Sequence, residues 1–206
     1  GDFGGAKQAL EQAVEIQPNS ARYHSRLATA EYRLGQLNRA EEHFEKATEL
    51  EPSDPNHSYN AALVKEDLGK SNEALPLIQR AIRQDSSQAA YHFTLGRIQE
   101  SLGNVQQAIE AHSAAIQRDS RYVKSLIELG RLLDENGAYD QALAVLDAAY
   151  RIEPESFEVN NNLGNVYLHK ELFERAVTHY TTAIGKRPNE PLVQYNLALA
   201  YLGNDR

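Results

Sequence analysis

Apolar and small residues recur along this chain in a pattern that repeats every 34 residues. In the unit 157–190, two stripes of such residues appear at helical spacing, one in each half of the unit. The first stripe holds Leu163, Gly164 and Tyr167, and the second holds Ala176, Tyr180 and Ala183. The pattern predicts two amphipathic helices joined by a tight corner.

The same unit recurs upstream without insertion or deletion. The full units are 21–54, 55–88, 89–122, 123–156 and 157–190, while residues 1–20 match the second half of a unit and residues 191–206 match the first half. Two equivalent positions hold only alanine, namely Ala6, Ala40, Ala74, Ala108, Ala142 and Ala176, and then Ala13, Ala47, Ala81, Ala115, Ala149 and Ala183. Small side chains let helix backbones approach closely, so enlarging one would overpack the contact by roughly 1–3 kcal/mol.

Two further positions punctuate each unit. The corner position reads Gly1, Gly35, Gly69, Gly103, Gly137 and Glu171, and the closing position reads Pro18, Pro52, Ser86, Ser120, Pro154 and Pro188. Glycine supplies the left-handed conformation that ends a first helix, and proline stops the second helix from continuing. At Glu171 a left-handed corner would cost about 1 kcal/mol.

The chain is therefore expected to be all-α, with about twelve antiparallel helices. The predicted helices are 4–16, 21–34, 38–50, 55–68, 72–84, 89–102, 106–118, 123–136, 140–152, 157–170, 174–186 and 191–203. One helix pair leaves its outer apolar faces in water, and stacking successive pairs covers them. We expect a single right-handed α-solenoid over residues 1–206.

A 34-residue helix-turn-helix with a Leu-small pair, two alanine columns and a closing proline resembles the tetratricopeptide repeat, and the resemblance covers the whole chain. It implies a right-handed α-α superhelix in which the first helix of each unit faces a concave surface that holds protein partners. The large aromatic residue of the family's first helix is absent. That column reads His24, Ser58, His92, Leu126, Asn160 and Gln194.

Net charge and residue composition exclude some classes of partner. The net charge of −8 opposes a nucleic-acid partner, and no apolar run approaches the roughly 18 residues that insert into a bilayer. This predicts a soluble protein, with cytoplasm and periplasm both open. The chain has no cysteine and no methionine and starts inside a repeat, so we expect a piece of a longer polypeptide.

Catalytic and cofactor chemistry find little support. None of the seven histidines is followed three or four residues later by a second metal ligand, so they are interpreted as packing or surface imidazoles. The carboxylates lie on solvated helix faces, and each glycine has a corner or close-packing role. We expect no enzyme activity, no metal and no cofactor.

The inner faces of the first helices carry the candidate binding residues. Asn is a poor helix former, so a helix that holds several of them is expected to use their amides, which could clamp the backbone of an extended peptide. Aromatic and aliphatic neighbours would form an apolar shelf, and arginines could hold a carboxylate. The predicted site is Tyr59, Asn60, Phe93, Arg97, Ile127, Arg131, Asn161, Asn162, Asn165, Tyr195 and Asn196.

The alternative is a solvated face, in which Arg97 pairs with Glu100 and Arg131 pairs with Asp134 on the same helix. Within the leading hypothesis the occupant is an extended peptide or a partner helix. Family members that clamp the acidic tail of heat-shock chaperones use Lys and Asn, then Asn, then Lys and Arg on three successive first helices. No window of this chain matches more than one of those positions, so a chaperone-tail clamp is not expected.

Two other roles stay open at this stage. Helices 4–16 and 191–203 could mediate self-association into a homo-oligomer, because each leaves an apolar face without a neighbouring repeat. The array could also be the substrate-recognition arm of an enzyme whose catalytic domain lies outside this sequence.

Overall fold

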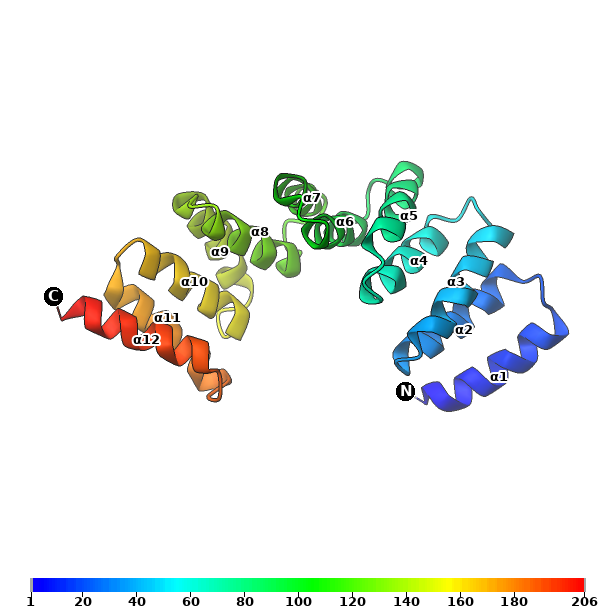
Figure 1. The fold of residues 1–206 in the computed structure, drawn as a ribbon, viewed down its shortest axis with the longest axis horizontal. Coiled ribbons are helices and arrows are strands. Elements are labelled where there is room, and N and C mark those ends of the chain that lie inside the picture. The colour runs from blue at the N-terminus through cyan, green and yellow to red at the C-terminus, as the bar shows by residue number, and fades with distance from the viewer. Residues whose placement is uncertain (1, 206) are drawn as a thin grey trace. The chain divides into compact units, whose positions relative to one another are not determined.

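The computed structural model describes residues 2–205, and every regular element in that part of the chain is a helix (Figure 1). The helices are α1 (Phe3–Ile16), α2 (Ala21–Arg33), α3 (Leu37–Leu50), α4 (Pro55–Asp67), α5 (Ser71–Gln84), α6 (Ala89–Ser101), α7 (Val105–Arg118), α8 (Val123–Glu135), α9 (Tyr139–Ile152), α10 (Phe157–His169), α11 (Phe173–Lys186) and α12 (Pro191–Asn204). Each lies within one residue of its predicted bounds. None of the described helices is long and apolar enough to cross a membrane.

The chain forms two compact units, residues 1–111 and 112–206. In the first unit α1 to α6 pack in chain order, and α4 also contacts α6. In the second unit α8 to α12 pack in chain order, and α10 also contacts both α8 and α12. The even-numbered helices, which open the repeats, therefore contact one another and form a row in each unit. We call them the first helices.

The core lies between neighbouring helices rather than at one centre. The alanines of both alanine columns within the five full repeats are fully buried. Around them pack larger side chains such as Phe44 between α2, α3 and α4, and Ile78 between α4, α5 and α6. Gly130 and Gly164 approach a second helix still more closely. A Cβ atom added to Gly164 would lie 2.5 Å from the ring of Tyr180, which is itself fully buried.

We expect Gly164→Ala to destabilise the second unit by about 1–3 kcal/mol, because the rigid ring of Tyr180 cannot move away without disturbing the packing. Gly185→Ala is a matched control in α11, where an added Cβ atom meets nothing within 4 Å. That change should stabilise the chain by up to about 1 kcal/mol through helix propensity. Urea unfolding measures both, and a Gly164→Ala variant as stable as Gly185→Ala would contradict this account.

The corners between first and second helices have the predicted left-handed conformation. Gly35, Gly69, Gly103 and Gly137 have φ between 73° and 77°, and Glu171 has φ of 57°. The next residue then donates its N–H to a carbonyl five residues back, as Leu172 does to Tyr167 at 2.8 Å, which satisfies a carbonyl at the helix end. The corner geometry persists at Glu171 although its Cβ makes it strained.

Glu171→Gly should raise the free energy of unfolding by about 1 kcal/mol, since glycine removes the strain of the left-handed corner. Glu171 is exposed, so little packing is lost. The reverse change, Gly137→Glu at the equivalent corner of the preceding repeat, should lower stability by a similar amount. Thermal or urea unfolding of the two variants compares them, and changes of the same sign would be inconsistent with corner strain.

The column that lacks the family's aromatic residue has a structural role. From this position the side chains of His24, His92, Asn160 and Gln194 reach the backbone carbonyl six residues earlier, at Pro18, Ser86, Pro154 and Pro188, with distances of 2.9, 3.1, 2.8 and 2.6 Å. Each bond ties the loop between repeats to the first helix that follows it. Asn160, an asparagine of α10 outside the predicted site, is therefore a structural residue, because it is buried and its amide bonds the loop.

In two repeats, a histidine of the second helix contacts the side chain that makes this hydrogen bond to the loop. His43 Nδ1 lies 2.9 Å from Nδ1 of His24, and His179 Nδ1 donates to Oδ1 of Asn160 at 2.9 Å. Because His24 donates through Nε2 to Pro18, its Nδ1 is the acceptor and His43 is the donor. Burial lowers the pKa of His43, with the neighbouring His24 adding to the effect, and burial also lowers the pKa of His179. Folding therefore favours the neutral form of both imidazoles.

The wild-type chain should lose more stability than a His43→Leu variant when the pH falls from about 7.5 to about 5.5. Leu77 occupies the equivalent position one repeat later, so leucine suits this packing. Above the unfolded pKa of about 6.5 both states hold a neutral His43. Below it the unfolded chain takes up the proton first, so folding weakens. Urea unfolding at both pH values measures the difference, and equal losses would refute the neutral imidazole.

Candidate binding grooves

The second unit contains a groove of about 560 Å³ on the first helices α8, α10 and α12. We call it the asparagine groove. Its lining residues are Arg131, Asp134, Glu135, Asn161, Asn162, Asn165, Leu168, His169, Asn196 and Leu199. Five of the residues predicted from the sequence, namely Arg131, Asn161, Asn162, Asn165 and Asn196, are thus brought together. Residues at spacings of three, four and seven share one face of a helix, which is why these positions converge.

Asn165 lies at the centre of a hydrogen-bond network in this groove. Its Oδ1 accepts from the Tyr180 hydroxyl at 2.7 Å and from Nδ2 of Asn196 at 3.2 Å. Both bonds reach the oxygen, so the amide is held in one orientation and its NH2 group has no hydrogen bond to other residues in the range 2–205. Burial raises the pKa of Tyr180, which keeps its hydroxyl protonated as the donor.

The other amides of α10 are arranged more loosely. Asn161 is half-buried, and its Nδ2 reaches Oδ1 of Asn162 at 3.4 Å. Asn162 is almost fully buried. The groove therefore presents amide donors and acceptors from two neighbouring helices, with Leu168 and Leu199 as its apolar part.

Charged residues form one side of the groove. Arg131 pairs with Glu128 at 3.0 Å and with Glu135 at 2.9 Å, both on its own helix. Asp134, named as the partner in the solvated-face alternative, bonds instead to Nδ1 of His169 on α10 at 2.8 Å. Burial raises the pKa of Asp134, although the His169 contact acts in the opposite direction. Arg131 is thus already engaged with carboxylates, which opposes its predicted role of holding a partner's carboxylate.

In the first unit the predicted arginine joins two helices. Arg97 pairs with Asp67 of α4 at 3.1 Å, and the Tyr32 hydroxyl also donates to Asp67. The described ion pair of Arg97 therefore joins two first helices, where the alternative had placed it with Glu100 on its own helix. The ring of Tyr59 packs against that of Tyr91 at a centroid distance of 4.7 Å.

Asn60 lines a second groove, of about 510 Å³, in the first unit. We call it the N-terminal groove. Its lining residues are Arg22, Ser25, Arg26, Thr29, Glu51, Asp54, Asn56, His57 and Asn60. They come from α2, from α4 and from the loop before α4, and only Asn60 belongs to the predicted site.

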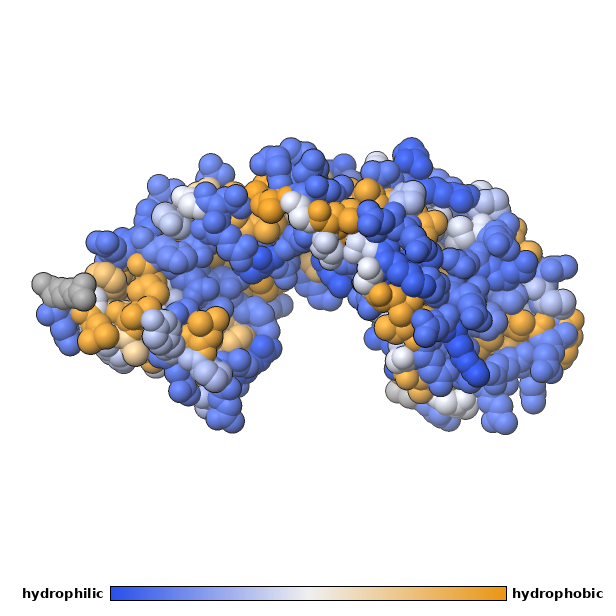
Figure 2. Space-filling view, in the orientation of Figure 1, coloured by the Kyte–Doolittle hydropathy of each residue, from blue (hydrophilic) through white to orange (hydrophobic). Residues whose placement is uncertain are grey.

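The predicted apolar shelf stays a prediction. Phe93 is half-buried on α6 in the first unit, while Ile127 is half-buried on α8 in the second. Tyr195 is 61% exposed on α12, beside other large apolar side chains of that helix such as Leu192 and Leu202. Figure 2 shows an apolar area at the C-terminal end of the chain. Self-association through the end helices also stays a prediction.

The residues that the sequence reasoning missed belong to contacts between consecutive first helices. Tyr91 donates to Asn56, Ser101 donates to Glu66 and His169 contacts Asp134, and in each pair the partners are 35 residues apart. A search for complementary polar residues at this separation, one more than the period, would have found them. Glu51, Asp54 and His57 of the N-terminal groove do not follow this 35-residue separation, because all three lie at the same loop between repeats.

Comparison with known proteins agrees with this architecture. One family model described as a tetratricopeptide repeat matches residues 59–123 and 127–191, and a second with the same description matches residues 1–63. Together they reach most of the chain. No curated protein sequence matches it.

Solved structures of similar fold are numerous. YrrB, described as a tetratricopeptide repeat protein with an unusual peptide-binding site, is 24% identical over 92% of this chain and 98% of that chain, with a TM-score of 0.73. PilF of Pseudomonas aeruginosa is 19% identical over 96% and 90%, with a TM-score of 0.85. A thermophilic tetratricopeptide repeat protein of Thermus thermophilus is 24% identical over 89% and 100%, with a TM-score of 0.66. At these identities the likeness shows a shared fold, the all-α solenoid expected from the sequence.

Proposed function

Since the chain belongs to the tetratricopeptide repeat family, we propose that it is a non-enzymatic scaffold whose asparagine groove binds an extended segment of a partner protein. The fold supports protein–protein interaction in general. The observation that carries the specific proposal is the convergence of four asparagines from α10 and α12 in one groove of about 560 Å³.

The amides favour recognition of an extended backbone. An extended peptide presents an N–H and a C=O at every residue, and an Asn side chain matches both with its oxygen and its NH2 group. Asn165 is already oriented by Tyr180 and Asn196, so binding need not freeze that side chain. Preorganisation of this kind improves affinity by lowering the entropy lost on binding.

The same lining disfavours a partner helix. An amphipathic helix docks through apolar side chains at helical spacing in a hydrophobic groove. Here Leu168 and Leu199 are the apolar side chains of the lining, and the remaining residues are polar or charged. We therefore favour the extended peptide over the helix.

Charge points to the kind of segment that fits. Arg131 is the one Lys or Arg among the lining residues, and the same lining holds the two acids Asp134 and Glu135. Complementary charge guides encounter and suppresses wrong partners. A segment that carries Lys or Arg fits this surface better than an acidic tail does. A peptide-binding site is also described for YrrB, which supports peptide capture as a use of this fold without transferring any residue.

Selection from a phage-displayed library of random linear peptides, followed by affinity measurement on synthetic peptides, tests the proposal. The Asn161→Ala/Asn196→Ala double variant should bind the selected peptides roughly 30-fold more weakly, since two neutral hydrogen bonds contribute about 1 kcal/mol each. Asn161 and Asn196 are half-buried and outside the alanine core, so the double variant should stay folded.

Asn189→Ala is the matched control, because Asn189 is an exposed asparagine of the same unit that does not line the groove. It should bind as the wild-type chain does, and circular dichroism should show all three proteins folded at the assay temperature. Unchanged affinity in the folded double variant would refute the asparagine groove as the binding site.

A further inference from the structure

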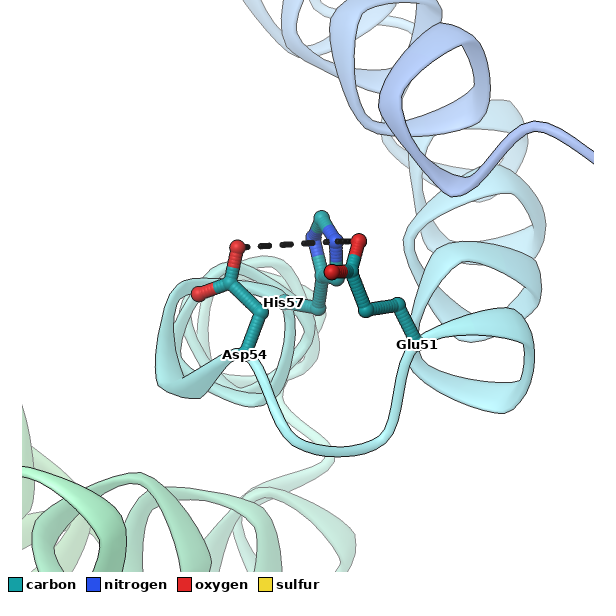
Figure 3. Close-up of side chains that lie close together, drawn as sticks. All are labelled: Glu51, Asp54 and His57. Carbon is teal, nitrogen blue, oxygen red and sulfur yellow. Dashed lines mark ion pairs between the residues drawn. The ribbon is translucent and has the colours of Figure 1, made fainter.

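Three side chains of the types that bind metal ions converge at the loop between α3 and α4. Glu51 directly follows α3, Asp54 caps the start of α4, and His57 lies in the first turn of α4. Figure 3 shows the imidazole between the two carboxylates. Nε2 of His57 is 3.5 Å from Oε2 of Glu51 and 3.7 Å from Oδ2 of Asp54, and one ligand atom from each residue lies within 4.8 Å of the others.

His57 is buried without a hydrogen bond. Its side chain is only 6% exposed, and neither ring nitrogen has a hydrogen-bond partner among the described residues. A buried polar atom that lacks a partner costs about 1–3 kcal/mol. Nε2 points toward the two carboxylates, at distances longer than a normal hydrogen bond. An atom placed between the three groups would satisfy Nε2 of His57.

The equivalent positions of the other repeats hold different residues. The residues equivalent to His57 are Tyr23, Tyr91, Ser125, Val159 and Val193. At 51 the equivalents are Gln17, Asp85, Asp119, Glu153 and Arg187, and at 54 they are Ser20, Gln88, Tyr122, Ser156 and Glu190. Among the six loops between repeats, two acids and a histidine occur together at these three positions only in the loop before α4. The repeat fold itself therefore does not require this combination.

We propose that Glu51, Asp54 and His57 form a binding site for a divalent transition metal of the zinc class. Zinc binds imidazole nitrogen and carboxylate oxygen at about 2.0–2.2 Å with tetrahedral geometry, which places two ligand atoms about 3.3–3.6 Å apart. The separation of 3.5 Å between Nε2 of His57 and Glu51 falls within this range, and the separation of 3.7 Å to Asp54 lies just above it. Imidazole as a ligand favours zinc, copper and nickel over calcium and magnesium.

Neighbouring groups hold the carboxylate of Asp54 in place, whereas the carboxylate of Glu51 can still move. Oδ1 of Asp54 accepts from the backbone N–H and from the side chain of Asn56, at 2.8 and 2.9 Å. This fixes the carboxylate so that Oδ2 remains for the metal, as hydrogen bonds around metal sites commonly do. Glu51 is 56% exposed and can move inward by a few tenths of an ångström.

The site opens into solvent on one side. All three residues line the N-terminal groove of about 510 Å³, so a metal can enter, and coordination positions remain for water or for a donor atom of a partner. The site lies in the first unit and shares no lining residue with the asparagine groove of the second. It does not depend on the proposed function.

Calorimetric titration with Zn2+ of the chain, freed of any affinity tag and treated with a chelator, tests the site. We expect one equivalent of Zn2+ to bind and the thermal unfolding midpoint to rise with it. His57→Tyr should abolish both effects, and the equivalents Tyr23 and Tyr91 indicate that tyrosine packs at this position. Glu51→Gln should weaken binding at least ~10-fold without disturbing a buried group.

Two controls separate this site from other histidines and acids. His92→Asn places the residue found at the equivalent position 160, and Glu49→Gln changes an exposed acid of α3. Both should bind Zn2+ as the wild-type chain does. Absence of one-equivalent binding would leave the cluster as neighbouring side chains without a metal and overturn the proposal. Binding that persists in folded His57→Tyr would show adventitious surface binding and overturn it as well.

Discussion

Helix backbones in this chain approach each other at positions where one of the two side chains is nearly absent. The alanine columns of the full repeats are fully buried, and Gly130 and Gly164 meet Leu146 and Tyr180 at distances that leave no room for a methyl group. Packed interiors tolerate such changes poorly. The spacing between helices, the direction of the first-helix faces and the width of the grooves all follow from these contacts.

The loops between repeats depend on a second constraint, a side-chain hydrogen bond from the following first helix to a loop carbonyl. His24, His92, Asn160 and Gln194 meet it with different side chains that all donate to the same backbone position. This explains why polar residues with ordinary or poor helix propensity replace an aromatic column. It also divides the asparagine run of α10, because Asn160 bonds the loop while its neighbours Asn161 and Asn165 face the groove.

With core and loops satisfied in this way, the exposed faces of the first helices are free to carry different chemistry in each unit. The asparagine groove offers oriented amides beside a salt-bridged helix. The N-terminal groove instead combines two arginines with two acids and a buried histidine. Two surfaces of similar size are therefore suited to different ligands, although the same repeat builds both.

The sequence alone determined the helices to within one residue and the left-handed corners at the glycines, while the same corner at Glu171 was established by the structure. The same residue types recur at the alanine, corner and closing positions of each repeat. These residues set the local backbone preferences directly, so the helix ends can be read from them. It also determined that Asn161, Asn162, Asn165 and Asn196 belong together, because residues at helical spacing on neighbouring first helices share a face. The partners of side chains were decided only by tertiary structure. Arg97 reaches Asp67, and His169 reaches Asp134, across neighbouring first helices. The 34-residue period specifies which helices are neighbours, but the rotamers and burial that select a partner depend on the packed positions of all side chains around it.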